Sequence, residues 1–177
     1  LNSGPGAVAG AFVHKRHAAN RDLPRLAGWW GNDPATRFRM QLEPEFVPVA
    51  SADSWQLSNP PILAMAPLRT SFMIFDEAGG MDPLRAKSLR LTSYLKFLLD
   101  RAPSRLFTVI TPGRPNEHGA QLSILVHEHP KELFKKLEAA GVKSDFREPN
   151  VIRVAPTPLY NTFYEVWRFA QILTGHH

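Results

Sequence analysis

The chain has 177 residues, of which 44% are hydrophobic and 21% charged, enough apolar sequence for one core or slightly more. It contains no cysteine, which excludes disulfides and thiolate metal sites and fits a cytoplasmic location. The sequence lacks a membrane-length apolar run and a signal-peptide pattern, and its net charge of +5 is scattered without interleaved aromatic residues, so we expect neither a membrane nor a nucleic acid as partner.

Residues 1–60 are rich in turn-forming residues and show little regular periodicity. The opening "LNSGPGAVAGAFVHKRH" begins inside a glycine-rich turn, and residues 7–13, AVAGAFV, predict a buried strand. A native chain end seldom lies in a loop against a core strand, so we expect these residues to continue an earlier segment. Six prolines between residues 20 and 61 then leave room for only short strands and turns. Such an irregular stretch is typical of a functional loop or a crossing between domains.

Two helices are predicted from Pro61 onward. The first covers residues 62–78, ILAMAPLRTSFMIFDEA, and would end at Gly79-Gly80. Asp82 as N-cap and Pro83 in the first turn would begin the second. Its apolar face at helical spacing comprises Leu84, Leu91, Tyr94, Leu95 and Leu98.

The remaining elements predict a small sheet with helices. Residues 106–111 and 120–126 predict an antiparallel pair of strands joined by a polar loop. Residues 130–141 predict an amphipathic helix ending at glycine, and residues 142–146 and 151–154 predict two more short strands. We therefore expect an α+β layer in which helices cover one side of a mostly antiparallel sheet.

A last helix is predicted near the C-terminus. Thr162 and Glu165 have the spacing of a capping box, in which the two residues satisfy each other's backbone N–H groups. The apolar face that follows comprises Val166, Phe169, Ala170 and Leu173.

Arg153 lies in the short strand VIRV, where alternation places it on the face opposite Ile152 and Val154. A guanidinium among valines requires an anionic partner. The residues leave two alternatives open: a salt bridge to Glu148 or Asp145, or a ligand carboxylate, which the arginine fork matches at two points.

Other candidate residues favour structural roles. His14 and His17 have the spacing of a helical metal pair, but no third ligand lies near in the sequence, so we expect a solvated surface and no metal. Trp29 and Trp30 in GWWG suit core packing or an interface, with an aromatic wall over a planar ligand as the sharper option. Asn59, before two prolines, is ordinary for a turn. No serine or threonine has a suitable histidine and acid nearby for nucleophilic hydrolysis.

Several motifs taken together resemble the C-terminal part of kynureninase. They occur in the family's order and at similar spacings over essentially the whole chain: "LNSGPGAVAGAFVHKRH", "LAGWWGNDPATRFRM", "QLSNPPIL", "ITPGRPNEHGAQLSI" and "IRVAPTPLYNTFYEVWRF". Each is weak alone, but GWWG, SNPP and RVAPTPLYN in that order are specific.

The resemblance implies an α/β architecture, the pyridoxal-phosphate-dependent transferase fold (fold type I, aspartate-aminotransferase-like). Residues 1–60 would be the end of the large cofactor-binding domain and the crossover, and residues 61–177 the small α+β C-terminal domain. The family is a cytoplasmic homodimer with shared active sites. It hydrolyses L-kynurenine or 3-hydroxykynurenine to anthranilate or 3-hydroxyanthranilate and L-alanine, in tryptophan catabolism and NAD biosynthesis.

The resemblance also assigns residues. Arg153 matches the family's substrate arginine, which binds the α-carboxylate of the amino acid. Trp29 and Asn59 match residues of the cofactor site. The Schiff-base lysine would lie just upstream of Leu1, so the chain itself would hold no catalytic residue and we expect it to be inactive alone. Trp30 and Asn32 depart from the pattern of some relatives and leave the preferred aryl ring open.

Two other interpretations fit the same residues. One is a different pyridoxal-phosphate enzyme of fold type I, such as a cysteine desulfurase or a small aminotransferase. The other is a free-standing amino-acid-binding regulatory module, which would use Arg153 on the carboxylate and need no cofactor.

Overall fold

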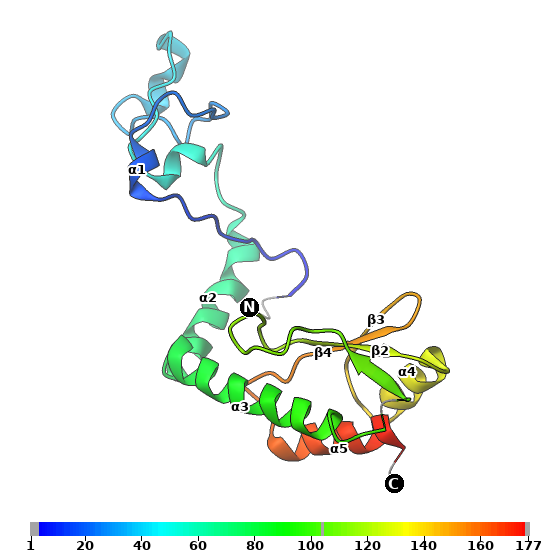
Figure 1. The fold of residues 1–177 in the computed structure, drawn as a ribbon. Coiled ribbons are helices and arrows are strands. Elements are labelled where there is room, and N and C mark those ends of the chain that lie inside the picture. The colour runs from blue at the N-terminus through cyan, green and yellow to red at the C-terminus, as the bar shows by residue number, and fades with distance from the viewer. Residues whose placement is uncertain (1–3, 104, 176–177) are drawn as a thin grey trace. The chain divides into compact units, whose positions relative to one another are not determined.

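The computed structural model describes residues 4–103 and 105–175 and is shown in Figure 1. The chain forms two compact units, Leu1–Met73 and Ile74–His177, and the division falls within helix α2 (Ile62–Glu77). The domain boundary expected near residue 60 stays a prediction. Among the described residues, no helix is both long and apolar enough to cross a membrane.

The first unit is mostly irregular, as its prolines predict. Its regular pieces are α1 (Lys15–Ala18), the 3-10 helices η1 (Arg37–Leu42) and η2 (Ala52–Trp55), a bridge between Asn32 and Pro48, and the first part of α2. The prediction of a buried strand at residues 7–13 is wrong: the segment is not a strand, and Phe12 is 88% exposed. A strand requires a hydrogen-bonded neighbour, and no described strand pairs with this segment.

Helices α2 and α3 (Met81–Leu99) meet at Gly79 and Gly80, both with positive φ, as the predicted helix end requires. The predicted N-cap at Asp82 is wrong, because Gly80 is the N-cap and α3 begins at Met81. Asp82 instead lies in the first turn of α3, where its negative charge interacts favourably with the helix dipole.

The second unit contains the predicted sheet (Figure 1). Strands β1 (Phe107–Val109), β2 (Leu122–Val126), β3 (Asp145–Arg147) and β4 (Val151–Val154) form one sheet in the order β1-β2-β4-β3, with every neighbouring pair antiparallel. Helices α4 (Pro130–Ala139) and α5 (Phe163–Thr174) complete the unit, and α5 packs on both α3 and α4.

One face of this sheet and the helices form the hydrophobic core. The predicted core positions of α3 and α5 are buried, with Tyr94 and Leu98 packed at the margin. The sheet contributes Phe107, Leu122, Ile124, Val126, Ile152 and Val154, which alternate with residues on the outer face. Arg153 therefore lies on the outer face of the sheet, as the alternation predicts.

The predicted capping box begins α5. The Thr162 hydroxyl accepts a hydrogen bond from Glu165 N at 3.2 Å, and the Glu165 carboxylate accepts one from Thr162 N at 2.7 Å. The backbone hydrogen bond from Thr162, followed by its hydroxyl, holds the pKa of Glu165 below its ordinary value. A depressed pKa means that the ionised side chain stabilises the folded state.

We expect Glu165→Gln to destabilise the 177-residue chain at pH 7 and to destabilise it less at pH 3. The stabilisation by a carboxylate with a lowered folded pKa is present above its unfolded pKa, about 4.3, and is lost as the pH falls through the folded value. Urea unfolding followed by far-UV circular dichroism at both pH values measures the difference. Glu128→Gln, in an exposed loop, is the control, and an equal loss at both pH values would contradict the charge-dependent cap.

Candidate functional site

The GWWG segment of the first unit lies directly against residues 54–57. A Cβ atom on Gly28 would stand 2.3 Å from the carbonyl oxygen of Leu57, and one on Gly31 would stand 2.9 Å from that of Ser54. No side chain fits at the first distance without moving backbone. The two glycines therefore allow the tryptophan pair to approach the segment that leads to Asn59.

Trp29 and Asn59, the residues expected at a cofactor site, are brought near each other by this contact. The Trp29 indole Nε1 donates to Ser58 Oγ at 3.2 Å, and Asn59 is the next residue, with an exposed side chain. Trp30 and Asn59, with residues 60–63, line a shallow hollow of about 580 Å³. The Ser58 hydroxyl and the Asn59 amide are uncharged donors that suit phosphate or carboxylate oxygens, whereas the Trp29 indole N–H is already donated to Ser58.

Asn32 turns inward. It is buried, its Oδ1 accepts from Val47 N at 3.0 Å, and its Nδ2 lies 3.5 Å from Thr36 Oγ1. These contacts give it a structural role in the loop. His14 caps α1 by accepting from Arg16 N at 3.1 Å. No three histidine, aspartate or glutamate side chains of the described residues are grouped to bind a metal ion.

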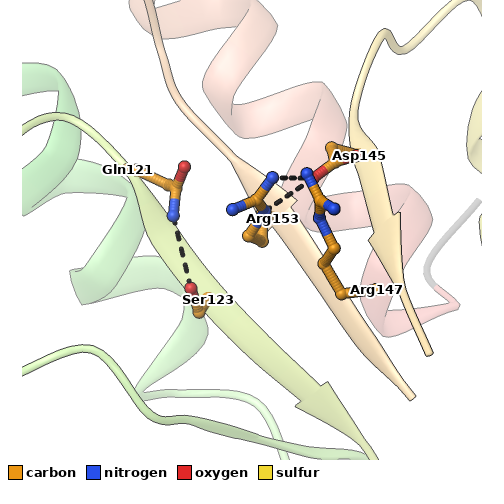
Figure 2. A network of polar contacts seen from close by, with 5 residues as sticks. All are labelled: Gln121, Ser123, Asp145, Arg147 and Arg153. Carbon is orange, nitrogen blue, oxygen red and sulfur yellow. Dashed lines mark hydrogen bonds and ion pairs between the residues drawn. The ribbon is translucent and has the colours of Figure 1, made fainter. Parts of the chain in front are cut away.

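Arg153 forms an ion pair with Asp145, one of the two partners that the sequence offered (Figure 2). Asp145 Oδ2 accepts a hydrogen bond from Arg153 Nε at 2.6 Å and also contacts Nη2. Arg147 Nε reaches the same oxygen at 2.9 Å. Glu148, the other predicted partner, pairs with Lys131 at 3.0 Å.

The exposure of this ion pair limits its effect on stability. The side chains of Arg153 and Asp145 are 32% and 47% exposed, and ion pairs that are this open to solvent contribute little to the free energy of unfolding. The hydrogen bond from Arg153 is the main cause that holds the pKa of Asp145 below its usual range, and Arg147 acts in the same direction. Stability alone is thus a weak reason for an arginine at this position.

A groove of about 720 Å³ lies beside Arg153. It is lined by the segment from α4 into β3, by the chain that leaves β4, and by one side of α5. Its charged side chains are Lys143, Arg153 and Arg168 against Asp145 and Glu165, a net excess of one positive charge. A groove with this balance favours an anionic ligand.

One distant and one local side chain hold the segment that follows Arg153. Lys87 Nζ donates to the carbonyl oxygen of Pro158 at 2.6 Å, and the Asn161 Oδ1 accepts from Thr157 N at 2.7 Å. The sequence interpretation missed both contacts. The motif RVAPTPLYN was a signal for Asn161, whereas nothing local indicated Lys87. The expected position of the cofactor lysine, upstream of Leu1, lies outside the described residues.

Comparison with known proteins shows what the chain is similar to. A family model described as the kynureninase C-terminal domain matches residues 84–173. The kynureninase of Myxococcus xanthus is 53% identical over 176 residues, covering 99% of this chain and 41% of that protein. The kynureninase of Xanthomonas oryzae pv. oryzae (strain PXO99A) is 54% identical over 172 residues, 96% of this chain and 40% of that protein. The chain spans about two fifths of the length of these relatives.

Solved structures show the fold. A C-DES mutant with glycine covalently linked to its PLP cofactor matches with a TM-score of 0.66 at 14% identity, over 87% of this chain and 38% of that one. The cystine C–S lyase C-DES with its product cysteine persulfide matches with the same score over 86% of this chain and 38% of that one. The predicted pyridoxal-phosphate-dependent transferase fold of type I is confirmed. The family match, which extends from α3 to α5 and includes Arg153, shows that the chain belongs to the kynureninase C-terminal domain family.

Proposed function

We propose that these residues form the C-terminal part of a kynureninase, which hydrolyses L-kynurenine or its 3-hydroxy form to an anthranilate and L-alanine. The observation that carries the proposal is Arg153, a half-buried guanidinium in a groove with a net positive charge, within the region matched by the family. Its fork would bind the α-carboxylate of the substrate at two points. Held there, the amino acid cannot rotate, so its reacting bonds keep one direction in the site.

Pyridoxal 5′-phosphate would be the cofactor, and when bound it withdraws electrons from the amino acid's α-carbon. Trp29 and Asn59 would hold it. The supporting observation is the close approach of Gly28 to Leu57, which groups the Trp29 indole with Ser58 and the exposed Asn59 amide. The Schiff-base lysine would come from the segment that precedes these residues in the relatives.

We also propose that the whole protein is a homodimer in the cytoplasm with shared active sites. Several large apolar side chains of the first unit are strongly exposed: Phe12, Leu26, Phe38, Leu42, Ile62 and Leu63. Apolar surface on this scale is typical of residues that another domain or subunit covers. The absence of cysteine in the sequence fits a reducing compartment.

A hybrid enzyme tests this function. It joins residues 1–177 behind the part of the Myxococcus xanthus kynureninase that precedes the matched region, which would supply the lysine. We expect the hybrid enzyme, loaded with pyridoxal phosphate, to release fluorescent anthranilate from L-kynurenine, and the 177-residue chain alone to release none.

Circular dichroism and cofactor absorbance serve as controls for folding and cofactor binding of the hybrid enzyme. A folded, cofactor-loaded hybrid that leaves kynurenine intact would contradict the proposal. Turnover of cysteine or of an aminotransferase substrate in its place would favour another fold-type-I enzyme. Anthranilate release by the 177-residue chain alone would show that the upstream lysine is not required.

A further inference from the structure

The contact between Asp145 and Arg153 is directional as well as electrostatic. The two residues are register partners across β3 and β4, and Ser123 of β2 is the register partner of Arg153 on its other side. The guanidinium thus stands between a carboxylate on one neighbouring strand and a hydroxyl on the other (Figure 2).

A guanidinium presents two edges that can bind a carboxylate, one formed by Nε and Nη2 and one by Nη1 and Nη2. Asp145 occupies the first edge through its Oδ2. Among residues 4–103 and 105–175, Nη1 has no hydrogen-bond partner. Figure 2 shows the remaining nitrogen directed away from Asp145, toward the side of Ser123 and Gln121, and Gln121 lines the same groove as Arg153.

We propose that Asp145 is a positioning residue: by holding the Nε–Nη2 edge of Arg153, it presents the Nη1–Nη2 edge to the substrate carboxylate. This inference rests on the proposed function of Arg153 and adds the direction from which the carboxylate is bound. Without Asp145, the side chain of Arg153 is free to rotate, and either edge can meet the ligand. The guanidinium must then be ordered when the substrate binds, which lowers the affinity for the carboxylate.

Two other roles of Asp145 would give different results. If Asp145 occupied the place of the substrate carboxylate, its removal would strengthen substrate binding. If the pair were only a surface ion pair, its removal would leave substrate binding unchanged. Measurement of KM therefore separates the three roles.

The test uses the hybrid enzyme with Asp145→Ala, Asp145→Asn and the matched control Glu148→Gln, an exposed acid outside the groove. We expect Asp145→Ala to raise KM for L-kynurenine by about 3- to 10-fold and to change kcat less. Asp145→Asn should retain part of the affinity, because its amide oxygen still accepts from Arg153 Nε. Glu148→Gln should leave KM unchanged.

A double-mutant cycle tests whether Asp145 acts through Arg153. In an Arg153→Gln background, Asp145→Ala should have no further effect on KM, since no guanidinium remains to be held. An additive effect, an unchanged KM or a lower KM in the single Asp145→Ala variant would each overturn the proposal.

Failure of the proposed function itself is distinguishable. It would appear as a lack of turnover in the unsubstituted hybrid enzyme. In that case the orientation of the Arg153 side chain is measured by hydrogen exchange at Arg153 Nε in the ¹⁵N-labelled 177-residue chain. Slow exchange in the unsubstituted chain that becomes fast in Asp145→Ala would support the positioning role of Asp145. Equal exchange in the two chains would overturn it.

Discussion

Arg153→Gln in the hybrid enzyme should lower kcat/KM for L-kynurenine by about 30- to 1,000-fold. The range corresponds to the roughly 2–4 kcal/mol typically lost when one partner of a desolvated, hydrogen-bonded charge pair is removed. Arg153→Lys should recover little of this, because an ammonium cannot match a carboxylate at two points. Steady-state kinetics with a fluorescent anthranilate readout measures both variants.

The same substitution should hardly change stability, and this contrast separates a ligand-binding arginine from a structural one. The ion pair with Asp145 is exposed, so its loss costs the fold little. Arg147→Gln is the matched control: it removes a second guanidinium from the same carboxylate, but Arg147 does not line the groove. We expect it to change kcat/KM by about threefold or less. A large fall in melting temperature for Arg153→Gln, with kcat/KM preserved, would show that Arg153 is structural.

Gly28→Ala should have the second large effect, a loss of cofactor affinity. The new methyl group would lie 2.3 Å from the carbonyl oxygen of Leu57, so backbone must move, and with it the segment that carries Ser58 and Asn59. Loss of one hydrogen bond to a charged group costs about 1.5–3 kcal/mol, so we expect the Kd for pyridoxal phosphate to rise by about 10- to 150-fold. Titration of the hybrid enzyme with pyridoxal phosphate, followed by absorbance, measures the affinity.

Gly10→Ala provides the control for this substitution. A Cβ atom on Gly10 meets nothing within 4 Å, and the residue also lies in the first unit. We expect its cofactor affinity and rate to equal those of the unsubstituted hybrid enzyme. If Gly28→Ala matched this control, the close contact between GWWG and residues 54–57 would not support the cofactor site.

Local patterns predicted most of the second unit. Helical spacing identified the buried faces of α3 and α5, the capping box identified the start of α5, and alternation in VIRV placed Arg153 on the outer face of the sheet. Each of these signals lies within a few residues of the feature that it predicts, and tertiary contacts did not oppose it.

Features that depend on distant residues were not predictable in this way. The contact of Gly28 with Leu57 and that of Lys87 with Pro158 join residues that are 29 and 71 positions apart. The strand expected at residues 7–13 failed for the same reason, since apolar character indicates a strand only when a partner strand lies beside it. Of the candidate site, the sequence offered Asp145 as one of two partners for Arg153, and only the register of β3 against β4 selected it.

The position of β3 at the margin of the sheet has a consequence for solubility. A terminal strand exposes unpaired backbone N–H and C=O groups, which can recruit a strand from another molecule and begin aggregation. Here the marginal strand is only three residues long, and charged Asp145 and Arg147 flank its single aromatic residue. Short length and alternating charge discourage such recruitment. The Asp145 carboxylate that orients Arg153 thus also helps to prevent association of strands between molecules.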